Sequence, residues 1–327
     1  MDFFSDTLKP RRFDSIFNLR GVYPLKVVSV INYKGGVGKT TISANLAVGL
    51  ASRGKKVLVI DLDPQASLTF SFFKVDEWRD NFSRFKTIKN WYDAFIDNDA
   101  DLNIEDLIVK KKYQRFDLDV ICSHLALINV DMELAGRLPG MNERDLRSNY
   151  LRVHSRLKKG IESLSNKYDY ILIDCPPNFN IVTKTAIVAS DFLLVPTKPD
   201  YLSTLGIEYL EKHVKEMVLT YNDHVLKVNN NSNGDLREIK PRILGIVFTM
   251  IQIRNQRPIS TLQNYINQIK RTKTPVFETF IRENKTLFGS APEYGIPVAI
   301  MGGVSGVTYE GIQDELESLT DEFISKV

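Results

Sequence analysis

The sequence predicts an α/β protein with a doubly wound, mainly parallel sheet and helices on both faces. Short, almost wholly apolar runs alternate with amphipathic helical patterns, as expected when strands are buried on both sides. A glycine-rich stretch, KGGVGKTT (34–41), follows the first apolar run and precedes a helical pattern. This strand–loop–helix order is typical of the P-loop NTPase fold. We expect a single domain of this fold over residues 26–327, preceded by an N-terminal arm over residues 1–25.

The first two strands and the helix between them form a βαβ unit. LKVVSVI (25–31) is an apolar run of the kind expected for a buried parallel strand, and KKVLVIDLD (55–63) is a second. Between them, TTISANLAVGLASRG (40–54) carries its apolar residues on one helical face and ends at Gly54, a common helix terminator. Strands joined in this way pair in parallel with a right-handed crossover.

The rest of the chain continues the alternation. Further buried strands are predicted at residues 116–123, 168–176, 191–199 and 242–250, with helices between them, notably at 142–165 and 203–221. Residues 70–115 are polar and aromatic without a clear strand and predict a helical insertion. Residues 222–240 are rich in asparagine and predict a flexible surface loop.

Composition indicates an ordinary cytoplasmic globular protein. Hydrophobic residues make up 43% of the chain and charged residues 25%, with a net charge of +3. Cys122 and Cys175 are far apart and lack metal-ligand spacing, which fits a reducing compartment. No run approaches the roughly 18 apolar residues of a membrane span, so no membrane partner is expected. A basic segment at 240–290 beside an acidic end at 291–327 fits contact with nucleic acid, and equally two solvated surfaces.

The glycine-rich stretch has the chemistry of a phosphate-binding loop. Its glycines let the backbone turn so that several N–H groups face one anion, and the following helix adds its positive end. Lys39 supplies a cation for the β- and γ-phosphates, and the Thr40 hydroxyl is a natural Mg²⁺ ligand. The nucleotide-binding residues predicted from the loop are Gly35, Gly36, Val37, Gly38, Lys39, Thr40 and Thr41.

Carboxylates stand at the ends of two neighbouring apolar strands. Asp61 and Asp63 end the strand VLVIDLD, and Asp174 ends YILID. Magnesium in such proteins is held by an aspartate at the end of a strand beside the loop. In a strand the side chains of Asp61 and Asp63 point to the same side, so both can face the γ-phosphate. We therefore expect a magnesium site formed by Thr40, Asp61 and Asp174, with the segment after Asp174 sensing the γ-phosphate.

The loop departs from the general pattern G-x-x-x-x-G-K-[ST] at two positions. Tyr33 stands where the first glycine belongs, and an additional lysine, Lys34, follows it. With this lysine, the segments KGGVGKTT, VLVIDLDPQAS and YDYILIDCPPN resemble the ParA/Soj branch of the deviant-Walker ATPases, which also include MinD. The resemblance runs from about residue 26 to 325 and is weakest at 70–115.

The resemblance implies a role for each of these side chains. Lys34 matches the signature lysine that reaches across an ATP-dependent homodimer to the phosphates of the other subunit. Asp63 matches the residue that positions the attacking water, so the expected catalytic residues are Lys34, Lys39 and Asp63. Asp61 supports the Mg²⁺ shell and Asp174 is the Walker B aspartate. For the adenine side it implies Met250 and Asn284, although Arg282 and Ser290 replace the family's usual proline and glutamate nearby.

The function implied is that of a ParA-type partition ATPase with ATP and Mg²⁺ as cofactors. Such a protein hydrolyses ATP slowly, dimerises with ATP, and binds DNA nonspecifically on the nucleoid. It segregates plasmid or chromosomal DNA with a ParB-like or other partner that stimulates hydrolysis. The basic residues that we expect at a DNA surface, each also compatible with a solvated charge, are Arg254, Arg257, Lys270, Arg271 and Lys273.

Other functions remain open within the same fold. An ATPase that positions a non-DNA cargo would share every motif. A MinD-like membrane regulator requires a basic amphipathic C-terminal helix, whereas DELESLTDEFISKV (314–327) is acidic. An electron-transfer ATPase requires cysteines that ligate a cluster, and no suitable pair is evident. A non-enzymatic nucleotide switch would not need Lys34, Lys39 and Asp63 together.

Overall fold

A computed structural model describes residues 24–97, 102–231, 236–254, 257–271, 273–302 and 306–327. The arm expected over residues 1–25 lies outside these residues, except for its last two.

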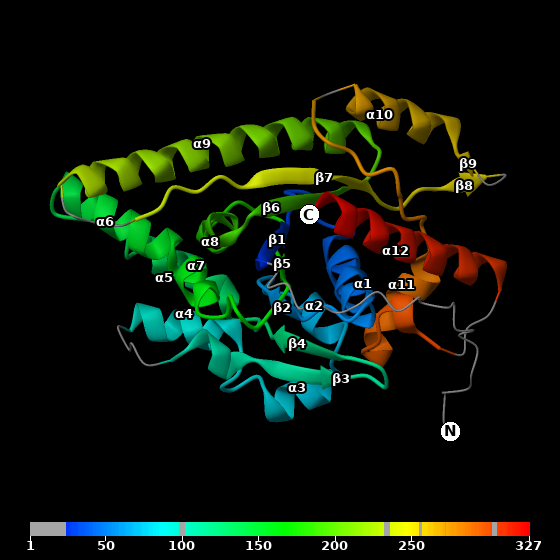
Figure 1. The fold of residues 1–327 in the computed structure, drawn as a ribbon, viewed down its shortest axis with the longest axis horizontal. Coiled ribbons are helices and arrows are strands. Elements are labelled where there is room, and N and C mark those ends of the chain that lie inside the picture. The colour runs from blue at the N-terminus through cyan, green and yellow to red at the C-terminus, as the bar shows by residue number, and fades with distance from the viewer. Residues whose placement is uncertain (1–23, 98–101, 232–235, 255–256, 272, 303–305) are drawn as a thin grey trace.

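A seven-stranded sheet forms the centre of the protein (Figure 1). Its spatial order is β3-β4-β2-β5-β1-β6-β7, and every neighbouring pair is parallel except β3 and β4. The strands are β1 (Lys26–Val30), β2 (Val57–Asp61), β3 (Val109–Lys112), β4 (Asp117–Ile121), β5 (Tyr170–Asp174), β6 (Phe192–Thr197) and β7 (Arg242–Phe248). The predicted fold class is confirmed.

Helices cover both faces and enclose two separate apolar clusters. One face is covered by α1 (Lys39–Ser52), α2 (Ser67–Phe70), α3 (Val75–Asn81), α11 (Lys285–Tyr294), the short η2 (Val298–Ile300) and α12 (Val307–Lys326). The other face is covered by α4 (Ile88–Ile96), η1 (Ile104–Leu107), α5 (Leu127–Ala135), α6 (Glu143–His154), α7 (Arg156–Glu162), α8 (Ile181–Ala189) and α9 (Tyr201–Asn231). A small hairpin of β8 (Ile253–Arg254) and β9 (Arg257–Pro258) leads into α10 (Ser260–Lys270), which lies beside α9. Figure 1 shows α12 alongside α1, and α9 along the edge formed by β6 and β7.

The sheet brings three strand ends to one place. β5 lies between β1 and β2, with Asp174 opposite Val30 on one side and opposite Asp61 on the other. The helix that follows β1 covers one face of the sheet and the helix that follows β5 covers the other. Chains that leave adjacent strands in opposite directions open a crevice at the carboxyl ends, where ligands of doubly wound sheets bind. The glycine-rich loop lies at this crevice.

The first helix begins and ends at glycines in left-handed conformations. Gly38, which precedes α1, has φ +84°, and a Cβ there would meet Thr249 at 3.4 Å. Gly54 has φ +76° and donates its N–H to the carbonyl of Ala51, which confirms it as the terminator of this helix.

The loop prediction for residues 222–240 is wrong in its first half, because α9 continues to Asn231. The asparagines pair with backbone instead of forming turns. The Asn222 side chain exchanges two hydrogen bonds of 2.9 Å with the backbone of Ile239, and Asn229 pairs in the same way with Leu236 at 2.8 and 3.2 Å. The helix is thereby fixed to the strand-like segment that returns to β7. Residues 232–235 of the expected loop lie outside the described residues.

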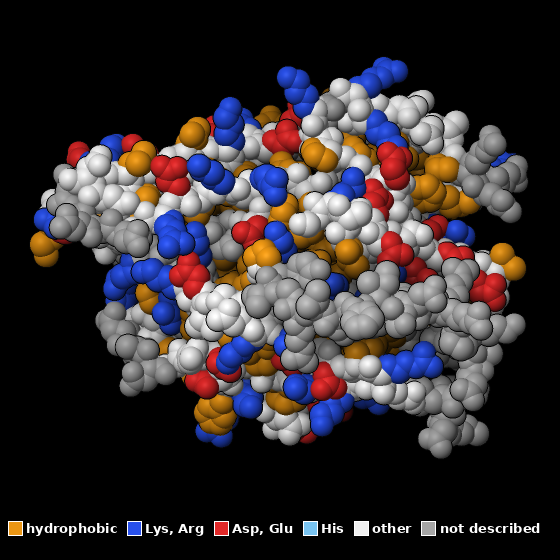
Figure 2. All heavy atoms as spheres, viewed as in Figure 1, with side chains coloured by type: hydrophobic (Ala, Val, Ile, Leu, Met, Phe, Trp, Pro, Cys, Tyr) orange, Lys and Arg blue, Asp and Glu red, His pale blue; other side chains and the backbone are white. Residues whose placement is uncertain are grey.

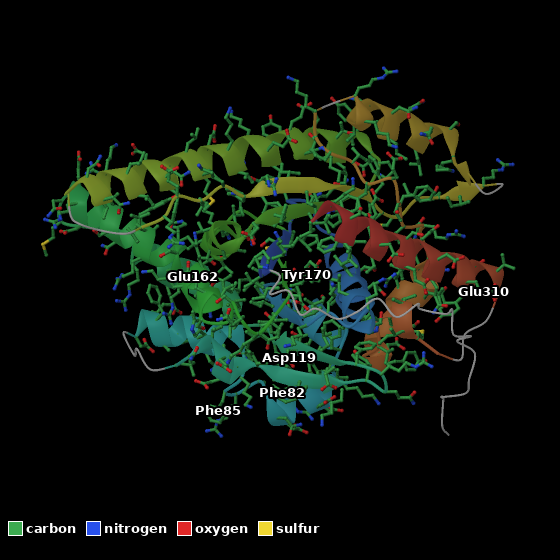
Figure 3. All side chains as sticks on the ribbon, viewed as in Figure 1. Phe82, Phe85, Asp119, Glu162, Tyr170 and Glu310 are labelled. Atoms are coloured by element: carbon green, nitrogen blue, oxygen red, sulfur yellow. The ribbon has the colours of Figure 1, made fainter. Side chains whose placement is uncertain are left out.

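The insertion at residues 70–115 contains α3, α4 and η1 as expected, but also a strand that was not predicted. β3 is an antiparallel edge strand of sequence VKKK in which only Val109 is buried. Lysines along an exposed edge oppose pairing with a second sheet, which explains why this strand lacks an apolar pattern. Phe82 and Phe85 lie at the outer edge of the insertion (Figure 3), where Phe82 packs on Phe73 while Phe85 is exposed.

The C-terminal helix uses its apolar face inside the protein. α12 packs on α1 and buries Tyr309, Ile312, Leu316, Leu319 and Phe323, and Phe323 also contacts Tyr170 near the middle of the molecule (Figure 3). That face is therefore occupied and not presented to a bilayer. Across the described ranges, no helix has the length and apolar character to cross a membrane.

Candidate nucleotide-binding site

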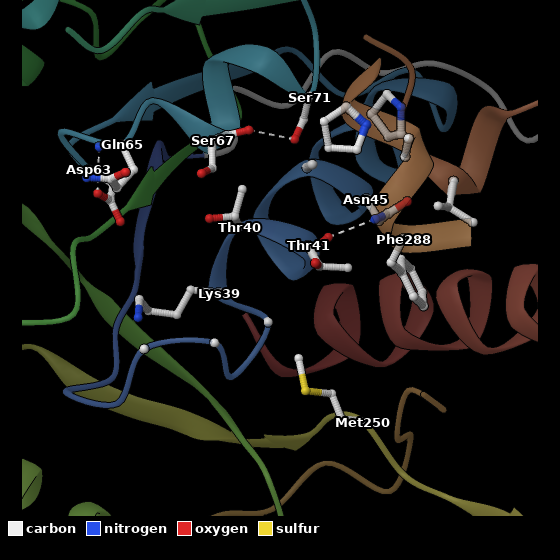
Figure 4. Close-up of a pocket in the computed structure, with 18 of the residues that line it drawn as sticks. Lys39, Thr40, Thr41, Asn45, Asp63, Gln65, Ser67, Ser71, Met250 and Phe288 are labelled. Atoms are coloured by element: carbon white, nitrogen blue, oxygen red, sulfur yellow. Dashed lines mark hydrogen bonds between the residues drawn. The ribbon is translucent and has the colours of Figure 1, made fainter. Parts of the chain in front are cut away.

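A cavity of about 420 Å³ lies at the carboxyl ends of the central strands. Its volume is in the range of roughly 300–1,000 Å³ that is usual for small-molecule sites. Figure 4 shows Lys39, Thr40 and Asp63 at one end, and Met250 and Phe288 at the other. A cation, hydroxyls and backbone N–H groups at one end suit phosphates, and the apolar other end suits a base.

The glycine-rich loop forms the charged end as predicted. Gly35, Gly36, Gly38, Lys39, Thr40 and Thr41 all line the cavity. Val37 does not: it is fully buried, and its carbonyl accepts a hydrogen bond from Thr249 Oγ1 at 2.7 Å. The backbone of Val37 therefore anchors the loop to the segment after β7.

Lys39 lies beneath the loop with only 6% of its surface exposed. Its Nζ donates to the carbonyl of Lys34 at 3.2 Å. Burial lowers the pKa of Lys39, while the carboxylates of Asp174 and Asp63 act in the opposite direction. An ammonium has three donors, so the contact with the loop leaves others for a phosphate.

Asp174 joins the start of α1 to the end of β5. Its two oxygens accept hydrogen bonds from Thr40 Oγ1 at 2.8 Å and from Ser43 Oγ at 2.9 Å. The carboxyl is fully buried, and burial raises its pKa to about 6 despite these two donors. A nearby divalent cation would favour the ionised form.

These residues fit a magnesium ion that takes most of its ligands from elsewhere. Within the described part of the chain, no group of three His, Cys, Asp or Glu could hold a metal by itself. Mg²⁺ commonly keeps several waters and binds nucleotide phosphates with few protein ligands. Thr40, which lines the cavity, is the direct candidate, and Asp174 orients its hydroxyl.

Asp61 has a different position from the one expected. It is fully buried, does not line the cavity, and both of its oxygens are occupied. Oδ1 accepts from the Asp63 N–H at 3.1 Å, and Oδ2 accepts from the N–H and the hydroxyl of Thr69, both at 2.8 Å. Burial and the charge of Asp174 raise its pKa. Asp61 thus fixes the backbone after β2, and its part in a magnesium shell stays a prediction.

Asp63 lines the cavity from the turn that follows β2. Its Oδ1 accepts from the Gln65 N–H at 2.9 Å, and the turn closes at Ala66, which has a left-handed φ of +54°. A positive φ is uncommon for a residue other than glycine and is found at functional turns. Gln65, Ser67 and Ser71 also line the cavity and were not predicted. The first two belong to the DPQAS segment that carried part of the family resemblance.

Lys34 does not line the cavity of its own chain. Its Nζ lies 2.9 and 2.8 Å from the two oxygens of Asp200 and 3.1 Å from Ser203 Oγ, at the start of α9. Burial opposes the ionisation of Asp200, but the hydrogen bonds from Lys34 and Ser203 outweigh it and lower its pKa. With side chains 35% and 40% exposed, the pair contributes at most about 1 kcal/mol. Lys34 is therefore held lightly beside the site.

Tyr33 explains the missing glycine of the loop. Its hydroxyl lies 2.6 Å from Nδ1 of His213 on α9, and its ring packs on Phe179, just after β5, at 5.4 Å. Burial raises its pKa to about 12, so the phenol is neutral. The side chain joins three segments: the loop, the turn after β5, and α9. A glycine would provide none of these contacts.

Of the two residues predicted to contact the base, Met250 lines the cavity and Asn284 does not. Met250 lies at the apolar end and has φ +55°. Asn284 caps α11 instead, accepting from the Leu287 N–H at 2.9 Å, so its contact with a base stays a prediction. Sequence reasoning missed Phe288 and Asn45. Asn45 lines the cavity and accepts from the Ala299 N–H at 2.8 Å, which fixes the η2 segment to α1.

The residues expected at a DNA surface lie in two groups at opposite ends of α10 (Figure 1). Arg254 is exposed in the hairpin before the helix, and Arg271 and Lys273 are exposed after it. Lys270 forms an ion pair with Glu278 at 2.8 Å, and the side chain of Arg257 lies outside the described residues. On the face shown in Figure 2, Lys and Arg side chains along α9 and α10 alternate with acidic ones.

Comparison with known proteins identifies relatives along most of the chain. A family model described as an AAA domain matches residues 25–227. The sporulation initiation inhibitor protein Soj of Bacillus subtilis is 30% identical over 275 residues, which cover 84% of this chain and 90% of Soj. The chromosome partitioning protein ParA of Caulobacter vibrioides is 28% identical over 281 residues, covering 85% and 87%.

Solved structures share the fold. A McdA–ATP complex from Cyanothece matches with a TM-score of 0.66 at 21% identity, over 92% of this chain and 96% of that one. Among structures of this fold are complexes with ATP or an ATP analogue, in one case with magnesium.

The buried charge of Asp174 has a measurable cost. A raised carboxyl pKa means that this group stabilises the fold fully below about pH 4, and that the contribution is lost as pH rises through about 6. Asp174→Asn should therefore raise the free energy of unfolding of the nucleotide-free protein at pH 7.5 by about 2 kcal/mol. Removing a carboxyl group whose pKa is raised by about two units should add about 3 kcal/mol to the free energy of unfolding. Losing one of its hydrogen bonds should subtract about 1 kcal/mol.

Urea titrations at pH 7.5 and pH 4 measure this effect, with the wild type as the reference. The gain should disappear at the lower pH, and the stabilisation of the protein by Mg²⁺ with ATP should be reduced in the variant. An Asp174→Asn protein that is less stable than wild type at pH 7.5 would contradict the assignment.

Proposed function

This chain belongs to the ParA/Soj branch of the ParA/MinD superfamily of P-loop ATPases, and on that premise we propose that it is a ParA-type partition ATPase. It binds ATP with Mg²⁺, hydrolyses it slowly, and forms an ATP-dependent sandwich dimer that binds DNA nonspecifically. The observation that carries the proposal is that the two lysines of the loop lie on different sides of the cavity wall. Lys39 lies inside the cavity of its own chain, and Lys34 lies outside it.

The hydrolytic step follows from the charged end of the cavity. Lys39 and the loop N–H groups would neutralise the β- and γ-phosphates, and Mg²⁺ bound beside Thr40 would supply further positive charge. Asp63 is the carboxylate at this end that lines the cavity. An isolated carboxylate is a poor base for water, so the part of Asp63 is to orient the water, and turnover should stay slow until a partner completes the site.

Charge explains why Lys34 would leave Asp200 for a second subunit. The contact with Asp200 is worth at most about 1 kcal/mol at its exposure. Before desolvation, an ammonium about 4 Å from one phosphate oxygen gains roughly 4 kcal/mol at an effective dielectric near 20, and on the same scale the closer contact with Asp200 gains about 6. Two triphosphates facing each other in a dimer offer several phosphate oxygens, whereas Asp200 carries a single charge. The lysine would leave Asp200 for that larger negative charge.

DNA is the proposed cargo of this dimer. The exposed Arg254, Arg271 and Lys273 suit phosphate contacts that do not depend on sequence. Dimerisation would bring together the basic ends of two α10 helices and so increase the number of simultaneous contacts. The proposed location is the cytoplasm, on the nucleoid in the ATP state, and the partner is a ParB-like or other protein that stimulates hydrolysis.

Hydrolysis is tested with Asp63→Ala. Among the described residues, the Asp63 side chain forms no hydrogen bond with the loop, so the variant should bind ATP about as tightly as wild type while phosphate release falls at least about 100-fold. Steady-state phosphate release and equilibrium nucleotide binding measure the two quantities. Unchanged turnover would remove Asp63 from its proposed role.

Dimerisation is tested in the Asp63→Ala background, where ATP persists. Adding Lys34→Ala should leave ATP binding intact and keep the protein monomeric, because the cross-subunit cation is lost. Adding Asp200→Asn instead is the matched control: it weakens the hold on Lys34 but keeps the lysine, so the dimer should form. Light scattering with ATP distinguishes the two, and an ATP-dependent dimer without Lys34 would refute the cross-subunit contact.

DNA binding is tested on long duplexes of unrelated sequence. Binding should require ATP and should weaken about 10-fold or more between 50 and 200 mM salt, since each phosphate contact releases counterions. Arg254→Glu combined with Arg271→Glu should weaken binding to every sequence alike. Fluorescence anisotropy with ATP and with ADP is the measurement. Equal binding without nucleotide would exclude an ATP-switched DNA dimer and favour a non-DNA cargo.

A further inference from the structure

A buried serine just after β4 is connected to both aspartates at the end of β2, Asp61 within the strand and Asp63 after it. Ser123 is fully buried and donates its hydroxyl to the carbonyl oxygen of Asp63 at 2.7 Å. Its N–H donates to Thr69 Oγ1 at 2.9 Å, and that hydroxyl in turn donates to Asp61 at 2.8 Å. A carbonyl oxygen can only accept, so the Ser123 hydroxyl is the donor in its bond with Asp63.

The network holds the backbone of Asp63 on both sides. Its N–H donates to Asp61 Oδ1 at 3.1 Å, and its carbonyl accepts from Ser123 and from the Ala66 N–H at 2.9 Å. One carboxylate oxygen, Oδ1, accepts from Gln65. Among the residues that the structure describes, none donates a hydrogen bond to the other oxygen, Oδ2. Oδ2 is thus available for a water, and its position follows from that of the backbone.

Ser123 is held in turn by the helical insertion. The indole N–H of Trp78, on α3, donates to the Ser123 carbonyl at 3.2 Å. Trp78 is almost completely buried, with its ring against Phe70 and His124. All three polar groups of Ser123 are therefore engaged: the N–H with Thr69, the carbonyl with Trp78, and the hydroxyl with Asp63.

We propose that Ser123 is a positioning residue for ATP hydrolysis. It holds the backbone of Asp63 in place and connects that backbone to the helical insertion through Trp78. The proposal rests on the proposed function, because Asp63 matters to turnover only in a protein that hydrolyses ATP. Ser123 does not line the cavity, so its effect passes through Asp63 and not through nucleotide binding. A displacement of about 1 Å at a reacting centre can reduce a rate by about 100-fold.

The test is Ser123→Ala in the full-length protein. Phosphate release should fall about tenfold in kcat, while KM and the affinity for a non-hydrolysable ATP analogue stay within about twofold. The Asp63 carbonyl keeps its second donor, Ala66, so the fold should persist. Trp78→Phe keeps an aromatic side chain, although a smaller one, and removes the donor to Ser123, so it should lower kcat by a smaller factor at unchanged KM.

Ser190→Ala is the matched control. Ser190 is also a buried serine outside the cavity lining that donates to a backbone carbonyl, but that carbonyl belongs to Ala186, at 2.7 Å, and not to Asp63. Its removal should leave kcat unchanged. A Ser123→Ala protein with wild-type kcat, or one that loses affinity in proportion to kcat, would overturn the proposal while the ATPase function stands. A wild-type protein without ATP turnover would instead overturn the proposed function, and this inference with it.

Discussion

The two hydrogen bonds that Asp174 accepts are the contact on which the site depends. They join Thr40 and Ser43, at the start of α1, to the end of β5, where β1 and β2 also end. The direction of the loop N–H groups and of the Thr40 hydroxyl is therefore set before a nucleotide binds. This arrangement buries a carboxylate whose pKa is raised to about 6. A cation beside Thr40 would stabilise that charge, so ligand binding and local stability are coupled.

The two lysines of the loop lie in different surroundings, and Tyr33 connects the loop to the rest of the protein. Lys39 is buried under the loop, and Lys34 is paired with Asp200 at the start of α9. Tyr33, between these contacts, touches both the segment after β5 and α9. A change at the γ-phosphate that moved the turn near Phe179 would thus act directly on the element that holds Lys34. The apolar face of α12 is buried against α1.

Local patterns predicted most of the fold and the charged end of the site. Buried strands, the glycine loop and the strand-end aspartates are each coded within about ten residues of sequence. What the sequence did not reveal depends on contacts between distant segments. The end of α9 is fixed by asparagines that pair with residues 236–239, and β3 is a strand only because β4 lies beside it. Asp200 and Ser123 have no local signature either, since each matters through a partner about 60 or more residues away.

The central claim is that Lys34 acts on the nucleotide of a second subunit, while Asp63 acts on that of its own chain. Mixing Lys34→Ala protein with Asp63→Ala protein and measuring ATP hydrolysis tests it most directly. In the mixed dimer, the nucleotide bound by the Lys34→Ala chain has its own Asp63 and the partner's lysine. The account predicts hydrolysis by the mixture although neither protein is active alone. A mixed dimer that forms but does not hydrolyse ATP would contradict it, because then both residues must serve the same chain.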